Sequence, residues 1–200
     1  MSKSDEKEMK PELIRSFIAI SIPEEIKQKL AELQARLKKA DAMVKWTRAQ
    51  GIHITLRFLG NVSVEEIKEA GEAISQVARQ FSPFLVEANG FGTFPERGRP
   101  RVIWVGLNQG VSQLKAIFEE LDKELINRGL GKADRAFSPH LTLGRIKTGK
   151  NLNKLLEYLK AEPEKAYGIF EAKSICLFRS QLRPEGAIYT LLREEFFSAK

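Results

Sequence analysis

The amino-acid sequence predicts a mixed α and β protein built from two related halves. Each half shows the same order of segments, namely strand, helix, histidine-bearing strand, helix and strand. The four-residue pattern His-x-Thr-Leu occurs once in each half, beginning at His53 and at His140. Equivalent positions keep a nearly constant offset, 86 residues from Arg15 to Arg101 and 87 from His53 to His140. A constant offset is typical of an internal duplication, and two unrelated runs of similar length are the alternative.

The first half is predicted to contain five elements. These are a strand at 16–21, a helix at 24–40, a strand at 51–60, a helix that begins after Ser63 and a strand at 84–88. The first helix is indicated by apolar residues at steps of three and four, and Ser63 with Glu66 forms the capping box of the second. In the segment 51–60 apolar and polar residues alternate, as they do in a half-buried strand. This alternation sets Arg57 on the same face as His53 and Thr55.

The second half repeats this order and adds one strand at its end. Its predicted elements are a strand at 101–107, a helix at 114–125, a strand that begins at His140, a helix at 152–159, and strands at 168–178 and 187–192. Asn151 is a residue type that favours the N-cap position, so it is expected to cap the second of these helices. Two related lobes that face each other would set the two histidine-bearing strands on opposite walls of one cleft.

The chain is expected to form one domain with a short tail. Residues 1–12 are polar, charged and aperiodic, which predicts a flexible N-terminal tail. Residues 13–200 are long enough for a substantial core and predict a single bilobal domain, with halves at about 13–95 and 96–200. No apolar stretch approaches the ~18 residues of a membrane helix, and the start of the chain lacks the apolar segment of a signal peptide. We therefore expect a cytoplasmic protein that does not bind a membrane.

Charge and cysteine content set weaker limits. The formal net charge is +7 and the isoelectric point is near 9.5. This balance favours polyanionic partners such as nucleic acid, although charged helix surfaces alone could produce it. The single cysteine, Cys176, lies in an apolar run, so it makes no intrachain disulfide and is expected to be buried.

The strongest functional signal is the repeated pairing of histidine with threonine. His53 and His140 are the only two histidines of the chain, and each is followed two residues later by a threonine, Thr55 or Thr142. Residues two apart on a strand share a face. A lone histidine on a strand is usually structural, but two of the six threonines of the chain occupy this one frame. The four side chains are therefore candidates for one site.

Three kinds of chemistry compete for these residues. A metal site would need a third ligand, and no carboxylate shares the histidine face of either motif. Nucleophilic catalysis would need a serine or cysteine beside a histidine, and none is visible. General acid–base catalysis needs one neutral and one protonated imidazole, and the threonine hydroxyls can donate to phosphate oxygens. This set suits displacement at phosphorus without metal or cofactor, with both limbs of the pH–rate profile near the ordinary histidine pKa of about 6.5.

The sequence resembles the 2H phosphoesterase superfamily and, within it, the RNA 2′,3′-cyclic phosphodiesterase (2′-5′ RNA ligase type) family. The similarity runs from about Arg15 to Leu192. It includes the motifs His-Ile-Thr-Leu-Arg-Phe-Leu-Gly ending at Gly60, Phe-Ser-Pro-His-Leu-Thr-Leu-Gly-Arg ending at Arg145, and a C-terminal Ser-x-Leu-x-x-x-Gly-x-x-Tyr ending at Tyr189. Either histidine motif alone is weak, and the two in this order with these flanks are specific.

The resemblance implies a bilobal α+β fold, with an antiparallel sheet flanked by helices in each pseudo-symmetric lobe and an active-site cleft between the lobes. It implies hydrolysis of RNA 2′,3′-cyclic phosphate ends to 2′-phosphomonoesters. His53 would be the proton donor, His140 the proton acceptor, and Thr55 and Thr142 would bind the phosphate. The expected partner is RNA with cyclic phosphate ends, for instance tRNA halves. No metal or cofactor is expected, and the protein is expected to be a monomer.

The resemblance also implies substrate-binding roles for Phe58 and Arg145, the fifth residue after each histidine. Simple alternation would set both on the strand face opposite the histidine. Phe58 is then either a core residue or a base-stacking residue, and Arg145 requires a bulge or a strand end, which Gly144 would permit. For Trp46 and Trp104 a core position is the default.

Two further points stay open at this level. The basic loop 97–101 either guides the RNA backbone or is an exposed turn with ordinary charges. An enzyme is favoured because both histidines and both threonines are present, and a non-catalytic RNA-binding module with the same cleft is the alternative. Hydrolysis and 2′-5′ ligation use the same groups.

Overall fold

The computed structural model describes residues 13–163, 166–184 and 186–199, so the predicted tail at 1–12 lies outside the described residues. The elements in chain order are β1 (Ile14–Ser21), α1 (Glu24–Lys38), β2 (Val44–Trp46), the short 3₁₀ helix η1 (Ala49–Gly51), β3 (His53–Val62), α2 (Val64–Ala78), β4 (Phe84–Phe94), β5 (Val102–Leu107), α3 (Val111–Asn127), β6 (Leu141–Ile146), α4 (Leu152–Ala161), β7 (Ala166–Ala172), β8 (Ser174–Arg183) and β9 (Gly186–Phe196). The predicted α+β class and all four predicted helices are confirmed, whereas β2 and η1 were not predicted.

One strand boundary was missed. The continuous strand predicted at 168–178 is two strands, β7 and β8, which separate at Lys173. β7 pairs with β4, whereas β8 pairs with β1 and β9, so the two strands lie in different parts of the sheet. The apolar run continues across the boundary, and only the pairing partners show where the strand ends.

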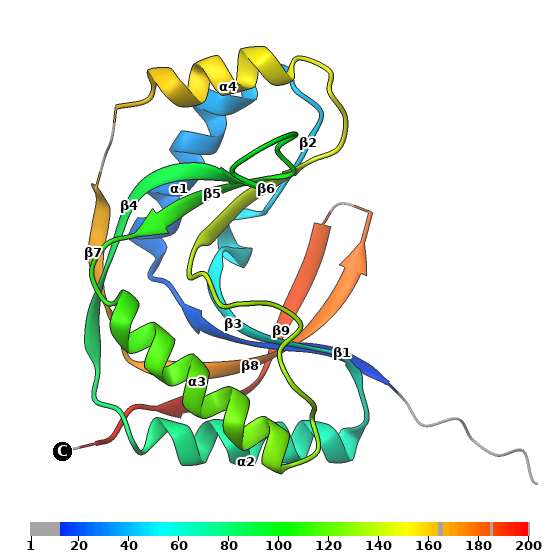
Figure 1. Cartoon of the computed structure of the whole chain (residues 1–200), viewed down its shortest axis with the longest axis vertical. Coiled ribbons are helices and arrows are strands. Elements are labelled where there is room, and N and C mark those ends of the chain that lie inside the picture. The colour runs from blue at the N-terminus through cyan, green and yellow to red at the C-terminus, as the bar shows by residue number, and fades with distance from the viewer. Residues whose placement is uncertain (1–12, 164–165, 185, 200) are drawn as a thin grey trace, which may run out of the picture.

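The nine strands of the described residues form one antiparallel sheet in the order β7-β4-β5-β6-β3-β1-β8-β9, with β2 added beside β6. The sheet is strongly curled, and the β8–β9 hairpin projects from it (Figure 1). At its centre β3 and β6 share a single backbone pair, Ile54 with Leu141. This narrow join divides the sheet into two lobes, β3-β1-β8-β9 and β6-β5-β4-β7.

The two lobes are not the two halves of the sequence. β8, from the second half, completes the lobe of β1 and β3, and β4, from the first half, completes the lobe of β5 and β6. The order β8-β1-β3 is thus repeated as β4-β5-β6 across the central join. Each lobe therefore contains strands from both halves of the sequence.

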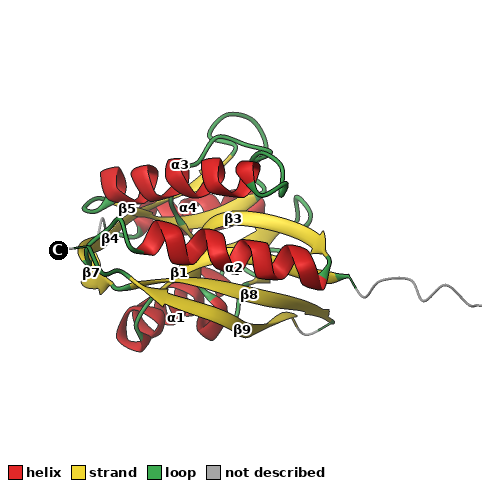
Figure 2. Ribbon diagram, turned by 90° about the horizontal axis from the view of Figure 1, so that it is seen from below, coloured by secondary structure: helices red, strands yellow, loops and turns green. Residues whose placement is uncertain are grey.

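The helices follow the same exchange. α2 and α3 lie side by side over the lobe of β3, β8 and β9, and α1 packs on β7 and α4 at the other end (Figures 1 and 2). The first helices of the two repeats are α1 and α3. Each of them packs on the lobe that does not contain the histidine strand of its own repeat. Apolar helix residues and the strand residues beneath them form one continuous buried core. No helix of the described residues is long and apolar enough to cross a membrane.

Local sequence signals are confirmed in two of three places. The capping box forms, because the Glu66 backbone N–H donates to Ser63 Oγ at 3.2 Å and the Ser63 N–H donates to the Glu66 carboxylate at 2.7 Å. Cys176 is buried. Asn151 stands at the N-cap of α4, but its side chain makes no cap hydrogen bond and instead donates to the Asp41 carbonyl at 3.0 Å. Its backbone is in the left-handed region at φ 53°, which turns the amide away from the helix.

Candidate active site

The join between β3 and β6 brings the four motif residues together. Ile54 and Leu141 are paired and completely buried. Continuing this antiparallel register by one residue in each direction sets His53 opposite Thr142 and Thr55 opposite His140. The four side chains are half-buried and point away from the core side that Ile54 and Leu141 occupy. The structure therefore brings together the two histidines and two threonines that the sequence paired.

Both imidazoles are held by the same backbone contact. His53 Nδ1 lies 2.8 Å from the Gly51 carbonyl oxygen, and His140 Nδ1 lies 2.7 Å from the Ser138 carbonyl oxygen. A carbonyl oxygen only accepts, so each Nδ1 carries the hydrogen and donates it. Each Nε2 is thereby left for a substrate, as an acceptor in the neutral ring and as a donor in the charged ring.

The surroundings of the two rings differ. His53 stacks on Phe17, with ring centroids 4.6 Å apart, and meets the edge of Tyr189 at 5.4 Å. His140 meets only the edge of Phe94, at 5.0 Å, among the described aromatic rings. Phe17, Phe94 and Tyr189 all lie in segments that resemble the family, but no sequence pattern indicates that they contact the histidines.

Burial sets the protonation of both histidines. Loss of hydration lowers the pKa of His53 to about 4, against the hydrogen bond to the Gly51 carbonyl, which favours the charged form. Burial also lowers the pKa of His140, and the positive charge of Arg145 lowers it further. The charge of His140 contributes to the lowered pKa of His53. In the free protein both imidazoles are neutral at neutral pH.

A bulge in β3 corrects the expected positions of Phe58 and Arg57. The pairing of β1 with β3 passes from Ala19–Thr55 to Ile18–Arg57, so Leu56 is an extra residue on β3. Each bulge reverses the faces of the residues that follow it. Phe58 therefore lies on the histidine face, 6.1 Å from the ring of Phe17, and is 57% exposed. Simple alternation was wrong here, and the core alternative for Phe58 is excluded.

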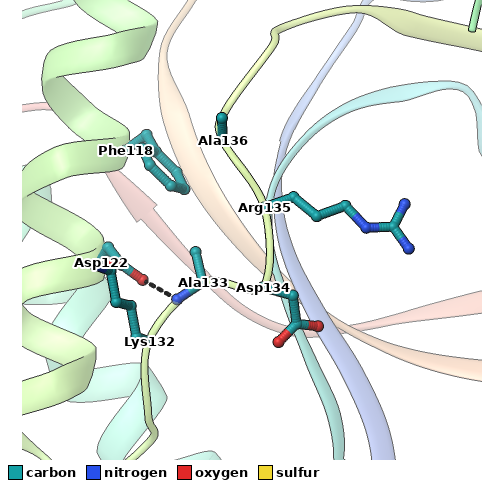
Figure 3. Close-up of a pocket in the computed structure, with 7 residues that line it drawn as sticks. All are labelled: Phe118, Asp122, Lys132, Ala133, Asp134, Arg135 and Ala136. Carbon is teal, nitrogen blue, oxygen red and sulfur yellow. Dashed lines mark hydrogen bonds between the residues drawn. The ribbon is translucent and has the colours of Figure 1, made fainter. Parts of the chain in front are cut away.

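The same bulge turns Arg57 to the buried side. Its Nε lies 3.3 Å from Asp122 Oδ1 on α3, at an angle unsuited to a hydrogen bond, so this contact is ionic. Its Nη2 donates to the Gly131 carbonyl at 2.8 Å. Asp122 Oδ1 also accepts from the Ala133 N–H at 2.9 Å, as the dashed line in Figure 3 shows. The Arg57–Asp122 pair thus fastens the loop that leads from α3 into His140.

β6 contains the equivalent bulge. Its pairing with β5 passes from Trp104–Thr142 to Ile103–Gly144, so Leu143 is the extra residue and Arg145 returns to the histidine face. Arg145 is exposed, and its charge acts on His140 and on Tyr189.

The bulge predicted before Arg145 is confirmed, and Gly144 has a further role beside it. A Cβ on this residue would lie 2.7 Å from Val44 Cγ1 and 3.1 Å from Trp46 Cε3. The glycine therefore admits β2 against β6, and the bulge itself is at Leu143.

The two tryptophans differ in position. Trp46 is half-buried against the core. Trp104 is half-buried and lies over Gly92, where a Cβ would clash with the indole ring. Its ring also contacts Phe94 at 5.0 Å, so it belongs to the aromatic surroundings of His140.

Metal ligands are not grouped in the part of the chain that the structure describes. No three His, Cys, Asp or Glu side chains of those residues stand close enough to hold an ion. The join presents two imidazoles, two hydroxyls and the nearby Arg145.

The family whose model is described as LigT like Phosphoesterase matches the chain twice, at residues 20–104 and 105–189. The chain belongs to this family. Two adjacent matches of similar length confirm the internal duplication that the repeated motif predicted. The two matches meet between residues 104 and 105, so each match contains one of the two histidine motifs.

Curated relatives of this LigT-like phosphoesterase include proteins named RNA 2′,3′-cyclic phosphodiesterase. One from Methanocaldococcus jannaschii is 38% identical over 90% of this chain and 99% of its own. Another, from Aeropyrum pernix, is 36% identical over 83% of this chain and 93% of its own. Among solved structures, TT0787 of Thermus thermophilus has a TM-score of 0.78 and 27% identity, covering 94% of this chain and 100% of that one. LigT of E. coli complexed with 3′-AMP has a TM-score of 0.72 at 24% identity, covering 94% of this chain and 99% of that one, which shows the shared fold.

Proposed function

We propose that this LigT-like phosphoesterase hydrolyses terminal 2′,3′-cyclic phosphates of RNA to 2′-phosphomonoesters. The observation that carries the proposal is the pair of imidazoles with matching Nδ1 anchors, each presented beside a threonine hydroxyl on one strand face. The names of relatives at 36% and 38% identity support the choice of RNA cyclic phosphate as substrate.

The reaction uses the two histidines in opposite protonation states. His140 Nε2 takes a proton from water while the water oxygen attacks phosphorus. His53 Nε2–H gives its proton to the 3′-oxygen as the P–O3′ bond breaks, which leaves a 2′-phosphate and a free 3′-hydroxyl. The hydroxyls of Thr55 and Thr142 donate to the phosphate oxygens that carry the charge in the transition state. No step requires a metal ion or a cofactor.

The lowered pKa of His53 means that the donor must acquire its proton with the substrate. A phosphate anion about 4 Å away contributes about 4 kcal/mol at an effective dielectric constant of 20. That free energy corresponds to about three pKa units, enough to bring a pKa of about 4 to neutrality. We propose that the anionic substrate charges its own proton donor.

Phe58 and Arg145 fit the binding of the terminal nucleotide. Both lie on the histidine face, after equivalent bulges. The exposed Phe58 ring offers a surface for base stacking, and the Arg145 guanidinium offers charge to a phosphate. A 5′-hydroxyl in place of water would give a 2′-5′ phosphodiester, so the same groups support ligation of RNA ends such as tRNA halves. We propose that a monomer is sufficient, because the residues of the site all come from one chain.

The proposal is tested by incubating the protein with adenosine 2′,3′-cyclic phosphate in excess EDTA. The expected product is adenosine 2′-phosphate, separated from the 3′ isomer by chromatography. Activity that disappears with the chelator and returns with added metal would refute the metal-independent mechanism. Binding of RNA ends without any turnover would instead support the non-catalytic alternative.

A further inference from the structure

A hollow in the protein surface lies next to Phe58, at the edge of the candidate site. Its volume is about 340 Å³. It is lined by residues of β1, β3 and the loop before β6, namely Arg15, Ser16, Arg57, Phe58, Leu59, Gly60, Leu130, Lys132 and Asp134. A Cβ on Gly60 would meet nothing within 4 Å, so the space beside this strand is open.

The hollow lies beside Phe58, further along β1 and β3 from His53. Phe17 pairs with Phe58 and Ser16 pairs with Gly60, so the lining residues follow Phe58 along the same two strands. The Phe17 ring lies 4.6 Å from the His53 ring and 6.1 Å from the Phe58 ring. A nucleotide with its phosphate at His53 and its base on Phe58 therefore has the hollow as its neighbour.

The charge of the hollow is positive. Within the described residues, neither Arg15 nor Lys132 forms an ion pair with a carboxylate, and the third cation, Arg57, is paired with Asp122. Asp134 is the one carboxylate among the lining residues. The charge of Arg15 also reaches Tyr189 beside His53, where it opposes the burial that raises the tyrosine pKa. A polar hollow with two available cations favours a phosphate group.

Lys132 is presented by a fixed backbone. The residue before it, Gly131, has its carbonyl held by Arg57 at 2.8 Å, and the residue after it, Ala133, has its N–H held by Asp122 at 2.9 Å. Both anchors are side chains of the buried Arg57–Asp122 pair. In Figure 3 the Asp134 carboxylate points away from Phe118, on the far side of the loop. The loop is thus pre-organised at the position of the cation, which limits the entropy lost on binding.

We infer that this hollow binds the phosphodiester on the 5′ side of the terminal nucleotide, so that an RNA end with this second phosphate is a better substrate than a free cyclic nucleotide. This inference rests on the proposed function, and it adds a binding site for the second phosphate. Arg15 and Lys132 contact that phosphate while Phe58 contacts the terminal base.

The test compares two substrates, adenosine 2′,3′-cyclic phosphate and the dinucleotide ApA with a 2′,3′-cyclic phosphate end. The wild-type protein is expected to show a kcat/KM at least about tenfold higher for the dinucleotide, the effect of one charge-assisted contact. Lys132→Ala is expected to remove most of this preference, mainly through KM for the dinucleotide. The preference should also fall as salt rises, with a shallower slope in the variant.

The matched control is Lys154→Ala, which removes an exposed lysine from α4 in the other lobe. It should leave the ratio of the two kcat/KM values unchanged. Equal kcat/KM values for the two substrates in the wild type would overturn the inference and leave the proposed function standing. So would a loss in Lys132→Ala of the same size for both. Failure of the wild type to hydrolyse either substrate would overturn the proposed function and the inference with it.

Discussion

β3 and β6 have the same backbone geometry around their histidines, but different side chains surround the two imidazoles. Both strands hold an imidazole by a carbonyl two residues earlier, and both have a bulge three residues after the histidine. The surroundings then diverge, since His53 stacks on Phe17 and meets Tyr189, whereas His140 meets the edge of Phe94. The two repeats share the backbone geometry that orients the imidazoles, and they differ in the side chains that pack against each imidazole and affect its pKa.

The comparison is tested most severely by removing each histidine in turn. His53→Ala and His140→Ala should each lower kcat for adenosine 2′,3′-cyclic phosphate by about 10²–10⁴-fold, the usual contribution of one acid or base. On a phosphodiester with a 4-nitrophenyl leaving group, which needs no protonation, the loss in His53→Ala should shrink and that in His140→Ala should persist. Near-wild-type rates for both variants would refute the whole assignment, and the reverse pattern would exchange the two roles.

The positions after the two bulges differ most, with Arg57 on β3 and Gly144 on β6. Arg57→Ala leaves Asp122 without its partner in a nearly buried setting, where side-chain exposures are 7% and 13%. The free energy of unfolding should fall by about 3–5 kcal/mol, as measured by urea denaturation. Lys173→Ala, which breaks an exposed pair with Glu171, is the control and should cost about 1 kcal/mol or less. Equal losses of unfolding free energy in the two variants would show that the buried pair stabilises the fold no more than the exposed pair does.

Adding a methyl group at Gly144 tests the corresponding position on β6. Gly144→Ala forces Val44 and Trp46 to move, and overpacking of this kind costs about 1–3 kcal/mol. Gly149→Ala is a suitable control, because its Cβ would meet only the flexible end of Arg99 at 3.4 Å. Thermal unfolding of both variants measures the difference. A stable Gly144→Ala protein would contradict the tight contact between β2 and β6.

The smallest expected effect is a displacement of the pH profile. The bell-shaped kcat/KM reports the free protein, in which burial lowers both histidine pKa values, that of His53 to about 4. The rate falls at low pH as the base is protonated and at high pH as the donor loses its proton. The whole bell should therefore lie below pH 6.5, and the bell for kcat should lie higher because the bound anion raises both pKa values. Limbs of kcat/KM above pH 6.5 would contradict the burial of the rings.

The sequence was sufficient to select four candidate residues that the structure brings together, and insufficient to predict which strand face their neighbours occupy. His53, His140 and their threonines were found because a short frame recurs with the only two histidines of the chain. Arg57 was expected on the histidine face, and Phe58 by alternation on the opposite one. The bulge in β6 was expected, because a buried unpaired Arg145 would be costly. Nothing comparable indicated the bulge in β3, since a bulge is a property of the register between two strands. The split of β7 from β8 was missed for the same reason.

The exchange of β4 and β8 between the lobes has a consequence for how the chain can be divided. A single repeat, from β1 to β4, contains a strand that pairs only within the opposite lobe, and it contains no complete three-stranded unit of its own. A cut near residue 95 would leave two fragments that each need the other to form either lobe. The smallest assembly able to build the two-histidine join is therefore a pair of repeats, and their fusion in one chain keeps the two halves of the site at a fixed one-to-one ratio.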